Sequence, residues 1–403
     1  MKKNDGLTKK LINKLKNLRA RLKLPIGVKI ALYILPVVIT ALFYILRESR
    51  NVMDWVVSYI VLPIRNFFGL MSSIYPFALM EILCTAAGIF LIYYIIKSIV
   101  NSWRRRERWK AMGKRFLPIL AIALYIWGIF CWLQSSGYHA AGFAEKHGFS
   151  DSGTAYEDLA AVTEFFAKKA SELSVQVERD ENGSLIFDRR VMFYQSRQIY
   201  KNISGEFESL QGRVYAPKPM TFYSWLMSAT GYTGMYFALT GESLINTQAH
   251  GAFMPATVAH EQAHQLGVFA ENEANFVAVL ACVTSGNITF EYSGYMVGLS
   301  YLSNALSGAN YDRWNRIMSG LSDEVKLDRA QNQEFWASKT TVNIGFDFLD
   351  SFLSWLLGVS NDVVNTVYDG YLKSQSQELG IMSYGACVDM LVEYFRENPE
   401  LVS

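Results

Sequence analysis

The chain has 403 residues, of which 51% are hydrophobic and 18% are charged, and its formal net charge is +2. Its mean hydropathy of +0.12 makes it more apolar than a typical soluble protein, and the apolar excess lies in the first third. The sequence shows no internal repeat, no low-complexity tract and no glycine-rich phosphate loop. These absences argue against a repeat protein and against a nucleotide-dependent enzyme.

Three apolar stretches predict a membrane domain at residues 26–135. They run over residues 26–46, 77–100 and 116–133, and each has about the 20 residues that a helix needs to cross a bilayer core. The sequence therefore predicts three transmembrane helices and a lipid bilayer as partner.

A fourth apolar patch, from Trp55 to Ile64, is shorter than a membrane span. It is bounded by Asp54, Pro63 and Arg65. We interpret it as an interfacial or re-entrant segment rather than a crossing helix.

Basic residues define the expected orientation. They fill the segment 1–25 before the first span and the segment 104–115 between the second and third spans. Because cytoplasmic loops carry an excess of Lys and Arg, both segments should face the cytoplasm. We expect a multi-pass protein of the cell membrane with a cytoplasmic N-terminus and residues 137–403 on the extracytoplasmic side. Lipid headgroups and topology explain the basic runs better than nucleic acid, so no nucleic-acid partner is expected.

The patterns in 137–403 predict a mainly helical domain with a small sheet. Residues 235–239 and 243–246, connected through Thr240-Gly241-Glu242, are expected to form a short hairpin or one strand with a turn. Helical periodicity is expected over residues 153–176, 189–210, 296–306, 311–327, 344–373 and 383–397. Another helix should carry the motif His260-Glu261-Gln262-Ala263-His264, with Pro255 in its first turn.

This motif predicts a zinc site. A helix places residues i and i+4 on one face, so His260 and His264 can bind one ion. Glu261 projects about 100° away from His260 and can reach a zinc-bound water without being a ligand. Zinc lowers the pKa of such a water to about 7, which makes Glu261 the expected general base.

Glu271 is the expected third ligand. On one unbroken helix it would lie about 10 Å beyond His264, so the chain must turn back, and Gly267 can adopt the left-handed backbone that ends a helix. Glu273 is the alternative ligand, because a different helix start would exchange the two glutamates. Asn275, four residues after Glu271, could orient a ligand from behind.

These residues carry a resemblance to known metallopeptidases. His260, Glu261 and His264, followed by Glu271, Ala274 and Asn275, resemble the gluzincin pattern, in which HExxH precedes a Glu-x-x-Ala-Asp/Asn sequence. Similar arrangements occur in membrane CAAX-type proteases and in ImmA/IrrE-like peptidases. The metzincin pattern is disfavoured, because position 270 is Ala where that pattern has its third ligand.

The whole chain is also similar to an uncharacterised bacterial membrane family of unknown function. The spans, Thr-Gly-Glu at 240–242, the metal motif and Ser-Tyr-Gly at 383–385 carry this second resemblance. It implies no substrate.

The first resemblance implies a zincin-like α+β domain and a zinc peptidase acting on proteins or peptides outside the membrane. Such an enzyme needs a donor for the oxyanion, for which Tyr384 is the first candidate, followed by His250 and Tyr301. The alternative function is a non-catalytic sensor or scaffold that zinc stabilises. The cysteines, including Cys282 and Cys387, are expected to be free thiols.

Overall fold

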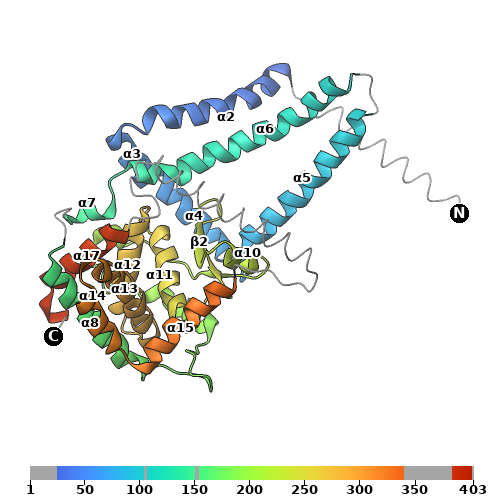
Figure 1. Ribbon diagram of the computed structural model, residues 1–403. Helices are drawn as coiled ribbons and strands as arrows, with labels where there is room; N and C mark the ends of the chain where they lie inside the picture. The colour runs from blue at the N-terminus through green and yellow to red at the C-terminus, as the bar shows by residue number, and fades with distance from the viewer. Residues whose placement is uncertain (1–24, 104–106, 150–153, 340–383, 402–403) are drawn as a thin grey trace. The chain divides into compact units, whose positions relative to one another are not determined.

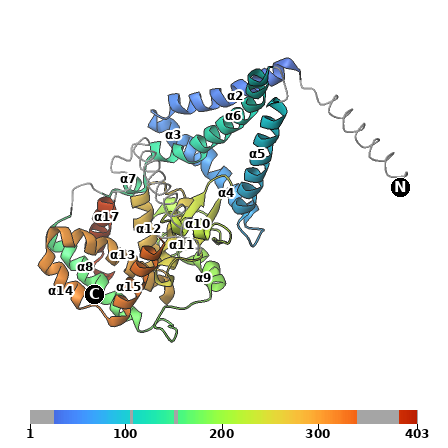
Figure 2. The same ribbon diagram turned by 45° about the vertical axis from the view of Figure 1, so that its right-hand side comes forward.

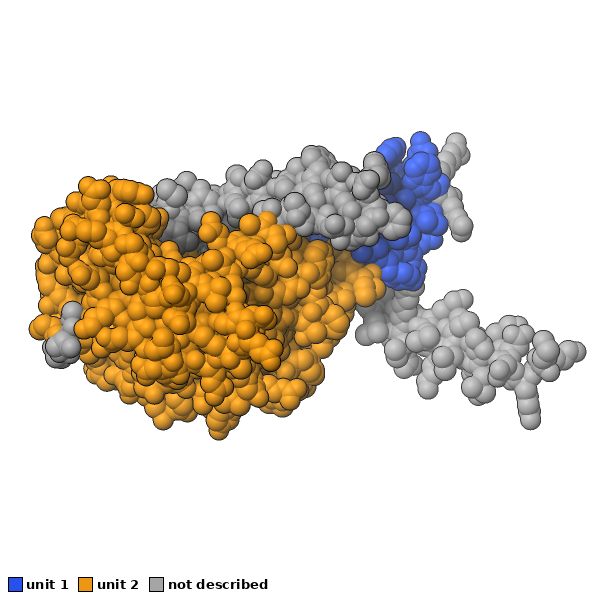
Figure 3. Space-filling view, turned by 60° about the horizontal axis from the view of Figure 1, so that its bottom comes forward, with its two compact units in different colours: residues 1–46, 92–131 blue, residues 47–91, 132–403 orange. Residues whose placement is uncertain are grey.

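The computed structural model describes residues 25–103, 107–149, 154–339 and 384–401 (Figure 1). The chain forms two compact units (Figure 3). The first unit contains residues 1–46 and 92–131, and the second contains residues 47–91 and 132–403. The boundary between the units falls within two long helices. The predicted helix at 344–373 and the basic segment 1–24 lie outside the described residues.

The first unit is built from apolar helices. It consists of α2 (Ile26–Leu46), the second half of α5 (Leu79–Trp103) and nearly all of α6 (Arg108–Leu133). The Tyr125 hydroxyl of α6 donates to the carbonyl of Leu32 over 3.0 Å. Gly128 allows α2 and α6 to approach closely, because a Cβ there would lie 2.9 Å from the Thr40 hydroxyl oxygen.

Four helical segments of the described chain are long and apolar enough to cross a membrane. Three of them, α2, α5 and α6, correspond to the three predicted spans. The fourth is the run Arg50–Ser72, which contains the patch predicted to be too short.

The prediction that this patch ends at Pro63 and Arg65 was wrong. The helix continues through both residues as α3 (Arg50–Val56), the π-helical turn η1 (Val57–Val61) and α4 (Leu62–Ser72). Pro63 lies at the start of α4, directly after the π-helical turn. A change in hydrogen-bond pattern at this position accommodates a residue that lacks a backbone N–H.

The second unit is mainly helical, and its core contains the helix that carries the motif His260–His264 and the two helices that follow it. In Figures 1 and 2, α11 (Met254–Gln265), α12 (Glu271–Val283) and α13 (Ile288–Ala309) lie side by side, and α8 (Tyr156–Ser174) packs on α13. The unit also contains α3, η1, α4 and the first half of α5. Its remaining described helices are α7 (Phe143–His147), α9 (Arg189–Gln195), α10 (Ser224–Ala229), α14 (Tyr311–Ser319), α15 (Asp323–Ser338) and α17 (Tyr384–Glu397). Its short 3-10 turns are η2 (Ser135–His139), η3 (Ser196–Gln198), η4 (Glu208–Leu210), η5 (Gly251–Phe253) and η7 (Pro399–Leu401).

A sheet of three strands lies against α11. Its order is β1 (Lys218–Met220), β3 (Glu242–Asn246) and β2 (Gly234–Phe237). β2 and β3 form the expected antiparallel hairpin, and β1 pairs in parallel with β3. β2 is therefore an edge strand next to the helix that carries the metal motif.

Most predicted helices are confirmed, and three differ from their expected extent. The helix predicted at 296–306 is α13, which begins eight residues earlier, at Ile288, and ends at Ala309. The predicted helix at 311–327 is two helices, α14 and α15, because the chain ends one helix at Ser319 and restarts with Ser322 as N-cap. The predicted helix at 189–210 is shorter and continues as 3-10 turns. The described cysteines, Cys84, Cys131, Cys282 and Cys387, form no disulfide bond, in agreement with the expected thiols.

Two buried carboxylates fasten the start of α5 to the sheet. The side chain of Glu242 accepts hydrogen bonds from the backbone N–H groups of Leu79 (2.8 Å) and Met80 (2.9 Å), so it caps α5. Glu81, in the first turn of α5, accepts from the N–H groups of Thr221, Phe222 and Tyr223 just before α10. Glu242 therefore satisfies N-terminal donors of α5, and Glu81 satisfies backbone donors of the loop before α10.

Lys218 adds a cation to this junction. Its ammonium lies 3.2 Å from the Glu242 carboxylate and donates to the Ser72 carbonyl at the end of α4. Burial lowers the pKa of Lys218, and the negative charge of Glu242 opposes this shift. The end of α4, the start of α5 and two strands thus meet at one ion pair.

We expect Glu242→Ala to destabilise the second unit strongly. The substitution leaves Lys218 and two helix N–H groups buried without their acceptor, and removing one partner of a buried ion pair costs about 3–5 kcal/mol. Denaturant unfolding in detergent micelles measures this loss. Glu172→Ala is the control, because the exposed Glu172 pairs only with surface lysines and should cost less than about 1 kcal/mol. Equal effects of the two substitutions would contradict the role given to the junction.

Candidate metal centre

The helix α11 is buried on most of its sides. Pro255 lies in its first turn, where the missing N–H of proline costs no hydrogen bond. Val258, Ala259 and Ala263 are fully buried in the main core. On the sheet side, the Ser243 hydroxyl donates to the Glu261 carbonyl over 2.8 Å. The position of the motif is therefore determined by both the helical core and the sheet.

The chain reverses direction directly after this helix. Gly267 has a φ of +92°, in the left-handed region that favours glycine. The N–H of Val268 bonds back to the Ala263 carbonyl over 3.1 Å. α12 then begins at Glu271, as the sequence predicts. This reversal brings the first turn of α12 beside the last turns of α11.

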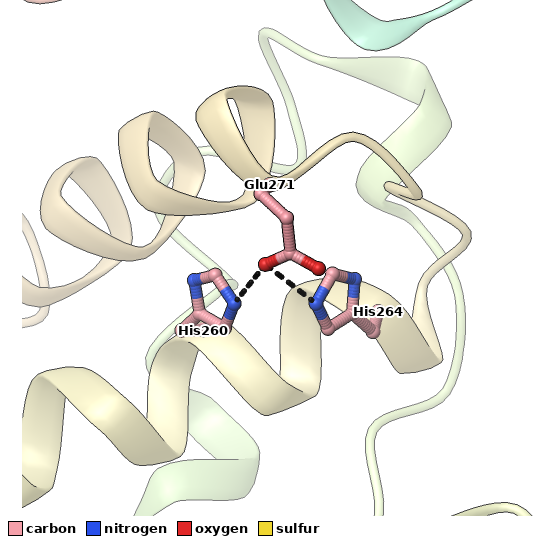
Figure 4. A group of neighbouring side chains, drawn as sticks. All are labelled: His260, His264 and Glu271. Atoms are coloured by element: carbon pink, nitrogen blue, oxygen red, sulfur yellow. Dashed lines mark hydrogen bonds and ion pairs between the residues drawn. The ribbon is translucent and has the colours of Figure 1, made fainter. Parts of the chain in front are cut away.

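Three side chains of these two helices converge (Figure 4). The imidazole Nε2 of His260 lies 3.1 Å from Glu271 Oε2, and Nε2 of His264 lies 3.7 Å from the same oxygen. One ligand atom from each residue falls within 4.8 Å of the others.

This donor set fits zinc. Tetrahedral ligands at about 2.0–2.1 Å from a zinc ion lie about 3.3 Å from one another. The distances from Glu271 Oε2 to the two imidazoles, 3.1 and 3.7 Å, lie on either side of that value. Two imidazoles and one carboxylate are also the donor types of catalytic zinc sites, which keep a fourth position for water or substrate. The three described side chains would hold the ion.

His264 is oriented by a backbone carbonyl. Its Nδ1 lies 2.7 Å from the carbonyl oxygen of Val268, in the turn between the helices. With Nδ1 donating a proton to this oxygen, Nε2 is the ring nitrogen left to bind a metal ion, on the side of Glu271. The same turn that brings Glu271 into place thus also sets the tautomer of His264.

The Glu271 carboxylate is stabilised by the two imidazoles. Burial by itself raises the pKa of Glu271, but the charge of His264 and the hydrogen bonds and charge of both histidines outweigh it. The net result is a pKa well below the ordinary range. Glu271 is therefore an anion at neutral pH, as a metal ligand must be.

Glu261 lies in an apolar environment next to the trio. Only 5% of the residue is exposed, and burial raises its pKa to about 8, with the charge of His260 lowering it and that of Glu271 raising it. The backbone of β2 presses on this side chain: a Cβ at Gly234 would lie 2.7 Å from Glu261 Oε1. A larger residue at 234 would displace Glu261.

The alternative ligand, Glu273, points away from the histidines. Its carboxylate accepts the N–H of Ala144 over 2.9 Å at the start of α7, and a Cβ at Gly142 would lie only 2.3 Å from its Oε1. Two residues along a helix correspond to a rotation of about 200°, which explains the separate environments. Glu273 caps another helix.

The candidate oxyanion donors do not join the trio among the described contacts. Tyr384 begins α17, but its side chain lies outside the described residues. His250 Nε2 lies 3.0 Å from Gln331 Oε1, and its Nδ1 accepts from the Ala252 N–H at the start of a 3-10 turn. Tyr301 packs against the main core. Their assignment to catalysis stays a prediction.

Two tyrosines that sequence reasoning did not select lie near the centre. Burial raises the pKa of Tyr232, and the negative charge of Glu271 raises it further, so its hydroxyl remains protonated within electrostatic reach of the trio. The ring of Tyr236 lies 6.5 Å from that of His264. Tyr232 precedes the edge strand β2 and Tyr236 belongs to it. In the sequence, only their place in or near the strand predicted before the motif helix could have indicated them.

Arg65 was also missed. It is 2% exposed, its Nη2 donates to the carbonyl of His264 over 2.7 Å, and its guanidinium lies over the rings of Tyr236 (4.2 Å) and Phe269 (4.6 Å). A cation at the C-terminus of α11 is favoured by the helix dipole. In sequence this residue appears only as a charge that interrupts an apolar patch.

A cavity of about 440 Å³ lies elsewhere in the second unit. Its lining includes Arg197, Lys201 and Arg213 but none of the three converging residues. The chemistry of the metal trio therefore does not depend on this cavity.

We expect Glu271→Ala to weaken zinc binding at least about 100-fold, since it removes a ligand rather than a group that orients one. Glu273→Ala is the matched control, because it removes the same side chain two residues along and leaves the trio intact. Chelator competition with metal analysis measures both. A greater loss of zinc from the Glu273 variant would contradict the assignment.

Zinc uptake should release a proton from Glu261. With a pKa of about 8, the metal-free side chain holds its proton at neutral pH and loses it only as the pH rises through that value. A dication at the trio lowers this pKa, so binding at pH 7 releases the proton. Calorimetry in buffers of different ionisation enthalpy counts the protons released for each zinc ion bound. The Glu261→Gln variant should release roughly one proton fewer than the parent protein. Identical release from both proteins would show that Glu261 is already ionised.

Comparison with known proteins yields one match. A family model described as "Protein of unknown function (DUF3810)" matches residues 56–392. No curated protein and no solved structure matches the chain. The match agrees with the expected resemblance to an uncharacterised family, and its description names no activity, substrate or cofactor. Because the match covers most of its length, the chain belongs to the DUF3810 family of unknown function.

Proposed function

We propose that the protein is a membrane-anchored zinc peptidase that hydrolyses peptide bonds in protein or peptide substrates on the extracytoplasmic side. The observation that carries this proposal is the convergence of His260, His264 and Glu271 within 4.8 Å. Glu261 lies beside them in a buried position. The donor set, its spacing and the adjacent carboxylate together match the requirements of zinc-assisted hydrolysis.

When bound, zinc supplies Lewis-acid chemistry that polarises a carbonyl and acidifies water. The proton transfers are carried out by a residue of the chain. Glu261 accepts the proton of the attacking water and returns it to the departing amine nitrogen. Its raised pKa, about 8 in the absence of metal, suits a group that must both take up and release a proton near neutral pH.

The edge strand β2 is the proposed binding site for the substrate backbone. The sheet order leaves one side of β2 unpaired with any described strand, and Gly234 brings its backbone against Glu261. An extended peptide that pairs with this edge would pass the general base. The peptide bond to be cleaved would then lie across α11.

The proposed orientation has a cytoplasmic N-terminus and an extracytoplasmic metal domain. The junction of Glu242 with the N–H groups of Leu79 and Met80 supports it, because it ties the domain to the end of α5 that this orientation places outside. The other end of α5 leads to the basic segment that should face the cytoplasm.

A non-catalytic sensor or scaffold is the second candidate. The junction that joins α4 and α5 to the sheet favours this candidate. Glu242 bonds to the start of α5, and its neighbour Ser243 donates to the Glu261 carbonyl. A movement of α5 would therefore shift the helix that carries the motif. Among the described residues, however, the metal group has three members. Such a site leaves a coordination position free, as catalytic sites do.

Replacing Glu261 with Gln tests catalysis directly. The amide keeps the shape of the side chain but cannot accept the proton of water, so turnover of an unstructured protein substrate should fall about 100- to 10,000-fold. Zinc content should be retained, because Glu261 is not a ligand. Activity assays of purified protein in lipid, paired with metal analysis, measure both. Unchanged turnover would contradict the role of Glu261, and no turnover by the zinc-loaded parent on any protein substrate would favour the sensor.

A further inference from the structure

We propose that the helical run Arg50–Ser72 does not cross the bilayer but lies in its outer interfacial region, as the lipid-facing wall of the metal domain, and that α10 extends the same lipid-contacting surface. This proposal concerns the second unit alone. It does not depend on whether the metal site is catalytic.

One face of the run is buried along its whole length. A third of its most apolar window, 33%, is buried, compared with 11 to 17% for the other three candidate spans. The buried positions recur at helical spacing and are Met53, Val56, Val57, Val61, Arg65, Gly69 and Ser72. This face belongs to the protein interior.

The opposite face is apolar rather than polar. Tyr59 is 70% exposed, Phe67 is 57% exposed and Trp55 is 56% exposed. From Trp55 to Met71 the only charged residue is Arg65, and it is buried. A surface helix in water would carry charged side chains on this face, whereas a helix in a membrane interface carries aromatic and aliphatic ones.

The metal domain contacts the run near its start, in its middle and at its end. The Asp54 carboxylate accepts the N–H of Ala141 over 2.7 Å, Arg65 donates to the His264 carbonyl over 2.7 Å, and the Ser72 carbonyl accepts from Lys218.

A crossing helix would separate these contacts. Its ends would lie on opposite sides of a hydrocarbon core about 30 Å thick, and the polar domain would have to follow it through the core. Charged groups within that core are strongly unfavourable. A helix that lies along the membrane surface can instead contact the domain along its full length.

Helix α10 presents apolar side chains at the level where α5 enters the membrane. Glu81 accepts the N–H groups of Phe222 and Tyr223, and the Tyr223 hydroxyl lies 2.6 Å from that of Thr85, one turn further along α5. Beside these contacts, Phe222 is 66% and Trp225 is 56% exposed. Aromatic side chains are enriched at membrane–water interfaces. Because the exposed rings of Phe222 and Trp225 adjoin the start of the candidate span α5, lipid is the expected partner of this surface.

Thiol labelling on the two sides of the membrane tests the course of the run. The parent for labelling carries Cys84→Ala, because Cys84 is the exposed cysteine and the other three are buried. Glu48→Cys and Ser73→Cys flank the run at exposed positions. An impermeant thiol reagent should reach both from the outer side of intact cells, whereas the control Trp109→Cys should react only after permeabilisation. Labelling of Glu48→Cys and Ser73→Cys from opposite sides would overturn the proposal.

Depth-dependent quenching tests the lipid contact itself. An environment-sensitive fluorophore on Tyr59→Cys or Trp225→Cys, in proteoliposomes, should be quenched more by nitroxide lipids labelled near the headgroup than by those labelled at the chain end. Val175→Cys is the matched control, since Val175 is 67% exposed and lies at the end of α8, away from the proposed surface. Its label should not be quenched.

Three results would count against the surface. Stronger quenching of Tyr59→Cys by the deep nitroxide would indicate a crossing helix. No quenching of Trp225→Cys would place α10 in water. Self-quenching that rises with the protein-to-lipid ratio, without nitroxide lipids, would indicate that a second copy of the chain covers the surface.

Discussion

The close approach of the Glu271 carboxylate to the imidazoles of His260 and His264 is the interaction on which the centre depends. It exists because the chain reverses within the five residues between α11 and α12. A half-buried carboxylate beside apolar helices is unfavourable on its own, and here the two histidines compensate by lowering the pKa of Glu271. Gly267, at a φ of +92°, makes the reversal possible. The turn, the tautomer of His264 and the ligand set are therefore one structural feature.

The same turn connects the centre to the helix of the membrane region. A Cβ at Gly267 would lie 2.7 Å from a methyl carbon of Leu62, and Arg65, one helical turn later, donates to the His264 carbonyl. Among the described residues, no carboxylate pairs with the buried cation Arg65. The helix C-terminus of α11 and two aromatic faces stabilise it instead. A residue from an apolar helix thus supports the end of the metal helix.

This support explains why the domain and the run Arg50–Ser72 form one unit. The buried face of the run contributes Arg65 and Gly69 to the surroundings of the motif and of the sheet, because a Cβ at Gly69 would lie 2.8 Å from the Tyr215 ring and 3.3 Å from the Gly241 carbonyl. Hydrophobicity alone does not distinguish a helix that packs between protein and lipid from a transmembrane helix. A helix buried on one side by protein and on the other by lipid is apolar all round, as a transmembrane helix is.

The sequence by itself determined the features that depend on neighbours along the chain. Periodicity and capping predicted the hairpin at β2 and β3, the start of α12 at Glu271 and the turn at Gly267, since helix and turn formation is governed by residues within one or two turns. The spacing of His260 and His264 likewise placed both on one helical face. Three of the four apolar helices were recognisable from length and composition alone.

Only the tertiary structure decided which distant groups meet. Arg65 reaches His264 across nearly two hundred positions of sequence, and the Glu261 side chain leaves no room for a Cβ at Gly234. Neither relation leaves a local pattern. The choice between Glu271 and Glu273 also required the packing of α7, whose N-terminus occupies the carboxylate of Glu273. The length of the apolar patch at Trp55–Ile64 was underestimated for the same reason. Asp54 and Arg65, which bound it in the sequence, bond to Ala141 and to the His264 carbonyl of a domain that begins some seventy residues later.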